Sequence, residues 1–131
     1  MPPRESSNPS DWLRVAEKDL DRVSRMLDDD DSEAAGFYLQ QSLEKFLKAF
    51  LLSKGWRLER IHDLEALLDA ALKYDTSLET FRDACQKITG FYIVERYPFI
   101  VASGLTKSDV QTSLDQIKGL VEKIRSQVRQ T

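Results

Sequence analysis

The chain has 131 residues, of which 41% are hydrophobic and 31% are charged, with five glycines and four prolines. This length suits one domain with a substantial core, and the composition is typical of a helical protein. The net charge of -3 excludes a protein that coats nucleic acid by bulk electrostatics, while it leaves room for a local basic patch.

Motifs for metal, cofactor or nucleophile chemistry are missing from the sequence. It contains no glycine-rich phosphate loop, no CxxC pair and no HExxH, and His62 is its one histidine. The single cysteine, Cys85, lies among apolar residues and is interpreted as a core residue rather than a nucleophile. We therefore expect no cofactor and no metal.

The sequence also lacks an N-terminal apolar signal and any unbroken apolar run of about 18 residues. We therefore expect a cytoplasmic protein with no membrane association.

The N-terminal residues predict a tail followed by one domain. The first nine residues contain three prolines and no apolar period, which predicts a disordered tail over 1–9 and a single helical domain over 10–131. Ser10 is the expected N-cap of the first helix. Apolar side chains then recur every three or four residues up to the acidic run at 28–31, which predicts one helical face: Trp12, Ala16, Leu20, Val23 and Leu27.

Four more helices follow the same pattern. The second is predicted over 32–54, with Gly55 as its stop, and the third begins after Asp63 as N-cap. The fourth begins at Thr76 or Ser77 and runs towards Pro98, and the last begins at Thr106. No useful strand alternation is present, so the sequence predicts an all-α fold, an antiparallel bundle of four to five helices.

The second predicted helix carries the first polar cluster. At 100 degrees per residue, four side chains form one polar stripe opposite the apolar face: Gln41, Glu44, Lys45 and Lys48. The plainer interpretation is a solvated helix face with a Glu44 to Lys48 ion pair, worth about 0.2 to 0.5 kcal/mol. The functional interpretation is a ligand-binding face.

Two further clusters lie at helix ends. His62 and Asp63 precede the third helix, where the imidazole either bonds local backbone or exchanges a proton near neutral pH. Tyr92 and Arg96 are four residues apart on the fourth helix, followed by Tyr97 and Pro98. Arg96 either caps the helix or binds phosphate through its guanidinium group.

Local charge favours phosphate binding. Residues 40–62 contain five basic side chains (Lys45, Lys48, Lys54, Arg57 and Arg60) and two acidic ones (Glu44 and Glu59). An acidic protein therefore has one positive region, in the same stretch as two of the polar clusters.

The order of these clusters resembles the HEPN family, the helical domain named for higher eukaryotes and prokaryotes nucleotide-binding. The resemblance runs from about Trp12 to Pro98, through "FYLQQSLEKFLKAFLLSKG", "HDLEALL" and "ITGFYIVERYP". It implies a helical bundle that forms a homodimer and often pairs with a minimal nucleotidyltransferase in a two-component, toxin-antitoxin-like system. Some members are metal-independent ribonucleases, and others bind nucleotides or RNA.

The sequence departs from the ribonuclease members of that family. Those members carry a histidine about four to six residues after the arginine, whereas "YPFIVASGLTK" follows Arg96 here without one. Phe99 also stands where an acidic residue is expected after the proline. The chain is similar to the branch that ends in "RYP".

For that branch the resemblance favours a nucleotide- or RNA-binding protein over an enzyme. Its expected phosphate-binding residues are Arg96, Tyr92, Tyr97, Lys45, Lys48, Gln41, Glu44 and Asp63.

Two alternatives stay open. One is a metal-independent endoribonuclease that uses Arg96 to stabilise charge on the phosphate and His62 as general base or acid. The other is a purely structural interaction partner that docks through the apolar stripe of the last helix, from Val110 to Val128.

Overall fold

The computed structural model describes residues 5–92 and 104–129. At Tyr92 it describes the backbone but not the side chain. Within these residues every regular element is helical, which confirms the predicted all-α bundle. The α-helices are α1 (Pro9–Asp28), α2 (Ser32–Ser53), α3 (Leu64–Leu72), α4 (Arg82–Thr89), α6 (Lys107–Gln116) and α7 (Lys118–Arg129). Two 3-10 helices, η1 (Thr76–Phe81) and η2 (Gly90–Tyr92), flank α4.

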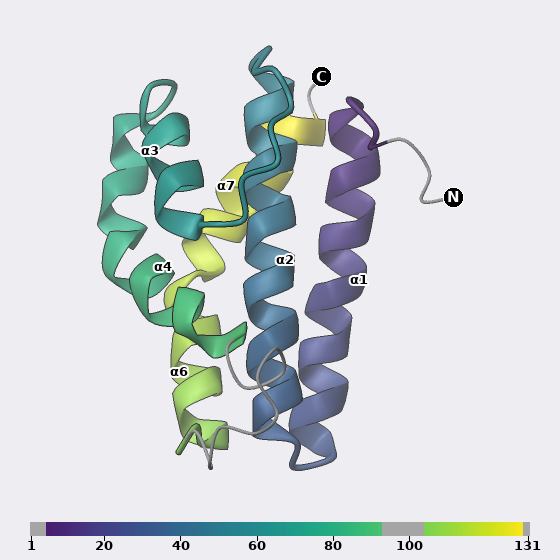
Figure 1. Cartoon of the computed structure of the whole chain (residues 1–131), viewed down its shortest axis with the longest axis vertical. Helices are drawn as coiled ribbons and strands as arrows, with labels where there is room; N and C mark the ends of the chain where they lie inside the picture. Colours follow the sequence, from purple (N-terminus) through teal and green to yellow (C-terminus); the bar gives the residue numbers. More distant parts are fainter. Residues whose placement is uncertain (1–4, 93–103, 130–131) are drawn as a thin grey trace.

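Helix α2 is the centre of the bundle. Figure 1 shows α1 and α2 lying side by side in opposite directions, with α3 and α4 on the other side of α2 and the α6–α7 pair following the same long axis. Every other α-helix of the described chain contacts α2. None of the helices in the described ranges is long and apolar enough to cross a bilayer.

The starts of α2, α3 and α6 agree with the sequence, whereas α1 starts earlier than predicted. Asp63 caps α3, as expected, and Thr106, the predicted start of the last helix, is the N-cap of α6. The predicted cap Ser10 is wrong: Asn8 caps α1, and its Oδ1 accepts a hydrogen bond from the Ser10 backbone N–H at 2.9 Å. The helix starts earlier because Pro9 suits a first-turn position, where its missing N–H is not needed.

The two C-terminal predictions need correction. The predicted fourth helix is an α-helix of eight residues, α4, between two 3-10 helices. Asp75, rather than Thr76 or Ser77, caps the first of these 3-10 helices, η1. The last helix is divided at Ile117 into α6 and α7. The last helix keeps its predicted buried face, so its division alters the count of elements but not the architecture.

The capping box at the start of α6 also perturbs a carboxyl group. The Thr106 side chain accepts from the Asp109 N–H, while the Asp109 carboxylate accepts from the Thr106 N–H. These hydrogen bonds hold the pKa of Asp109 below its ordinary value. The contribution of the box is present above the unfolded pKa of a carboxyl group and is lost as pH falls through the lowered folded pKa.

The apolar stripes predicted from helical spacing form the core. On α2 these residues are Leu39, Leu43, Phe46, Leu47 and Phe50, all buried. The stripe of the last helix is also internal at Val110, Ile117, Val121, Ile124 and Val128, and Leu114 is half-buried. This stripe is therefore core, and the alternative that it serves as an exposed docking face is wrong.

Gly36 of α2 lets two segments approach the helix closely. A Cβ at this position would lie 2.6 Å from Leu105 Cδ2 and 3.2 Å from Phe91 Cβ. Phe91 precedes and Leu105 follows the stretch that carries Arg96, so this glycine helps to hold both ends of that stretch against α2.

We expect Gly36→Ala to lower the free energy of unfolding by about 1 to 2 kcal/mol, measured by urea denaturation. Alanine favours a helix interior by about 1 kcal/mol over glycine, but the clash outweighs this gain because Phe91 Cβ cannot rotate away. Gly90→Ala is the control, because a Cβ there meets nothing within 4 Å. Stabilisation by Gly36→Ala would contradict the observed packing.

Candidate functional site

The polar stripe of α2 is largely buried, contrary to the interpretation of a solvated face. Glu44 and Lys48 are 4% and 2% exposed, while Gln41 and Lys45 are half-buried. Two elements cover the stripe: α1, and the connection between α2 and α3, which returns far enough for His62 to reach Glu44. The periodic pattern of one helix does not show which other elements bury it, so the burial of this stripe was not predicted.

Glu44 joins two other predicted site residues. Its Oε2 accepts from Lys48 Nζ at 3.2 Å, which confirms the expected ion pair, and lies 3.2 Å from His62 Nδ1. The His62 side chain is 73% exposed, so its ring lies at the surface while its partner is buried. The second oxygen, Oε1, is buried and has no hydrogen-bond partner in the described structure. The three residues form one buried-to-surface cluster.

Lys48 has a second partner on α1. Its Nζ lies 5.2 Å from the centroid of the Trp12 ring, a favourable position for an ammonium ion. With a carboxylate and an aromatic face beside it, this ammonium group is compensated inside the protein. A phosphate in solution therefore does not reach Lys48.

A neighbouring pair lies one helical turn away. Asp19 of α1 is 2% exposed and accepts from Lys45 Nζ and from Arg22 Nη1 at 2.5 and 2.6 Å. Lys45 also lines a hollow of about 390 Å³ with Trp12 and Val15. Lys45 is thus accessible at its edge, but its charge is already paired.

Two other predicted site residues do not join this cluster. Asp63 caps α3 by accepting from the Glu65 N–H, and the amide of Gln41 bonds to that of Gln40. Arg96 and Tyr97 lie outside the described residues, as does the side chain of Tyr92. Their role in phosphate binding stays a prediction.

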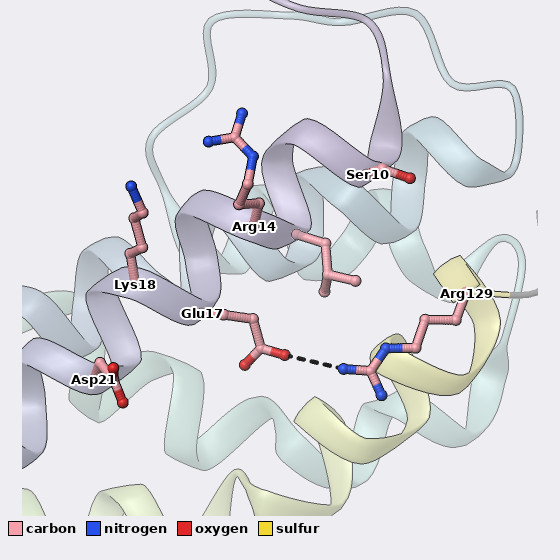
Figure 2. Close-up of a pocket in the computed structure, with 7 residues that line it drawn as sticks. Ser10, Arg14, Glu17, Lys18, Asp21 and Arg129 are labelled. Carbon is pink, nitrogen blue, oxygen red and sulfur yellow. Dashed lines mark ion pairs between the residues drawn. The ribbon is translucent and has the colours of Figure 1, made fainter.

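Another hollow, of about 500 Å³, lies between α1 and α7 (Figure 2). None of the predicted site residues lines it. Glu17 at its centre accepts from Arg125 at 2.6 and 2.8 Å and pairs with Arg129 at 3.5 Å. The hydrogen bond to Glu17 raises the pKa of Arg125. These pairs join α7 to α1, which is a structural role.

Cys85 is a core residue, as predicted. It is fully buried, and desolvation raises the pKa of its thiol to about 12. The thiolate that a nucleophile needs is therefore scarce at neutral pH.

Two partners of the lysines on the α2 polar stripe were not identified from the sequence, Asp19 for Lys45 and Trp12 for Lys48. Asp19 lies three residues after Ala16 and four before Val23, and so shares their buried face; this spacing was a usable signal. Trp12 was assigned to the apolar face of α1, and no sequence pattern pairs its ring with Lys48 across 36 positions (48 minus 12).

Known proteins share this helical architecture. A family model described as HEPN domain matches residues 9–127. The crystal structure of TT1696 from Thermus thermophilus is similar, with a TM-score of 0.79 and 26% identity over 93% of this chain and 99% of that chain.

ST0689, an archaeal HEPN homologue, superimposes with a TM-score of 0.72 over 92% of this chain and 98% of that chain. Its identity is 22%, so this likeness shows a shared fold alone. No protein with a curated description matches the sequence significantly.

Proposed function

The chain belongs to the HEPN domain family, and from this premise we propose that it is a HEPN-type nucleotide- or RNA-binding protein. In the same proposal it acts in the cytoplasm as a homodimer and as the partner of a minimal nucleotidyltransferase in a two-component, toxin-antitoxin-like system. Phosphate is the group it recognises, and binding rather than catalysis is its activity.

The observation that carries this proposal is the family match across nearly the whole chain, with "ERYP" at 95–98 in its expected order. Family membership supports a nucleic-acid or nucleotide ligand. Arg96 is the proposed central contact, because a guanidinium group can donate two parallel hydrogen bonds to one phosphate. Tyr92 and Tyr97 are its proposed neighbours.

We expect Arg96→Ala to lower affinity for nucleotide or short RNA by at least about tenfold, since a charged bidentate contact is worth about 1.5 to 3 kcal/mol. Isothermal titration calorimetry with AMP, ATP and a short single-stranded RNA measures this change. Arg25→Ala is the matched control, because Arg25 is an exposed arginine in the last turn of α1. Equal affinity of Arg96→Ala and wild type would refute the proposed contact.

The same samples also address the ribonuclease alternative. One observation favours it: the imidazole of His62 is exposed while the buried Glu44 carboxylate orients its Nδ1. Intact RNA recovered in the presence of EDTA supports binding without cleavage. RNA that wild type cleaves and His62→Ala leaves intact would assign the protein to the ribonucleases instead.

A further inference from the structure

The segment between α2 and α3, residues 54–62, is here named the basic connection. It begins after Ser53 and returns along α2, since His62 contacts Glu44 nine residues (53 minus 44) before the helix end. At 1.5 Å per helical residue, this return covers about 13 Å. Figure 1 shows the segment descending from the end of α2 along that helix before α3 begins.

The basic connection is anchored at both ends. The Trp56 N–H donates to the Leu51 carbonyl oxygen at 3.0 Å, and the side chains of Trp56 and Ile61 pack against the core. Between these anchors the side chains of Arg57 and Arg60 are exposed. The anchored backbone therefore presents two guanidinium groups to solvent from one short segment.

Within the described part of the chain, these guanidinium groups have no internal partner. Neither Arg57 nor Arg60 has an ion pair or a hydrogen bond in the described structure. The two lysines that the sequence predicted as phosphate ligands differ, because Lys48 is bound to Glu44 and Lys45 to Asp19. The positive charge available to a ligand therefore lies on the basic connection and not on α2, where the sequence predicted it.

The net charge of the basic connection is positive, as the binding of an anion requires. Residues 54–62 contain three basic side chains (Lys54, Arg57 and Arg60) and one acidic one (Glu59), while the whole chain is at -3. Lys54 donates a hydrogen bond to the neutral amide of Gln127 on α7, which holds its side chain without cancelling its charge. Within the described structure the two arginines are thus the basic side chains of the segment that have no internal partner.

We propose that Arg57 and Arg60 contact phosphates of one RNA strand, which extends the ligand from a nucleotide to a polynucleotide lying along the basic connection. This inference rests on the proposed function. Successive phosphates of one strand match cations carried by one short segment, and arginine binds each phosphate with two donors. Three residues of extended chain span at most about 11 Å, which limits the contact to neighbouring nucleotides.

An acidic protein surface is the competing occupant, and the surroundings disfavour it. Protein interfaces concentrate their energy in buried aromatic or aliphatic anchors surrounded by other contacts. Among the residues that the structure describes, Tyr74 is the one exposed large hydrophobic side chain, and it lies outside the basic connection. A charged segment without an exposed apolar anchor suits a polyanion.

The test measures binding of a fluorescein-labelled single-stranded RNA to the full chain by anisotropy at several salt concentrations. For Arg57→Gln with Arg60→Gln we expect affinity at least about tenfold lower. Losing two phosphate contacts also makes the plot of log K against log salt shallower by about 1.4. Both side chains are exposed, so circular dichroism is expected to show an unchanged fold.

Arg25→Gln with Lys73→Gln is the matched control, since both residues are exposed and the net charge changes equally. An equal loss in both double variants would overturn the inference, because bulk charge would then explain it. If wild type binds AMP or ATP but no RNA, the inference fails and the proposed function stands. If wild type binds neither, both fail. Unchanged RNA binding with lost binding of poly-glutamate would assign the segment to an acidic protein and overturn it as well.

Discussion

Lys48→Ala is expected to lower the free energy of unfolding by about 3 to 5 kcal/mol, because it leaves the buried Glu44 carboxylate without its cation. The remaining partner, His62, lies at the surface and is charged only when protonated. The variant also loses the contact between the ammonium group and the Trp12 ring. Urea denaturation followed by circular dichroism measures the change.

Two further variants distinguish the loss of the ion pair from the loss of side-chain packing. Lys45→Ala is the matched control, because its partner Asp19 keeps Arg22, and the expected loss is about 1.5 kcal/mol. Glu44→Gln combined with Lys48→Met removes both charges at similar volume and is expected to recover most of the stability. A Lys48→Ala protein within about 1 kcal/mol of wild type would show that the pair is not desolvated as described.

Phe46→Ala is expected to cost about 3 to 5 kcal/mol, the range for deleting a fully buried aromatic ring. Phe46 has no exposed surface and lies on α2, the helix that contacts every other α-helix of the described chain. The Arg125 guanidinium group lies 5.9 Å from the ring centroid, so the ring also supports the residue that joins α7 to α1. Thermal and urea unfolding both report the loss.

Phe46→Leu and Tyr74→Ala are the controls for that measurement. The leucine variant keeps most of the apolar volume and is expected to lose less than about 1.5 kcal/mol. Tyr74 is 46% exposed, so its truncation is expected to change stability by no more than about 0.5 kcal/mol. Similar losses for Phe46→Ala and Tyr74→Ala would contradict the position of Phe46 in the core.

The helices could be predicted from the sequence because caps and apolar spacing depend on residues that are close together in the chain. Asp63 was identified as a cap and Thr106 as a helix start, and the stripe from Leu39 to Phe50 was identified by its three- and four-residue spacing. Predictions failed where a local rule had a competitor. Asn8 replaced Ser10 as a cap because Pro9 fits the first helical turn.

The candidate site was only partly readable. Glu44, Lys48 and His62 were all identified, and Glu44 to Lys48 was expected as an i, i+4 pair. The contact with His62 links positions 18 apart, through a connection whose path no periodicity describes. Asp19 and Trp12, the partners of Lys45 and Lys48, come from another helix.

Sequence alone determined that this protein is an all-α bundle, because helix propensity, caps and periodic apolar faces are properties of neighbouring residues. It also placed an excess of positive charge between residues 40 and 62. Only the tertiary structure decided which of those charges remain available to a ligand. Burial by α1 and by the returning connection pairs Lys45 and Lys48 internally, because a desolvated charge needs a counter-charge. The same path leaves Arg57 and Arg60 in water.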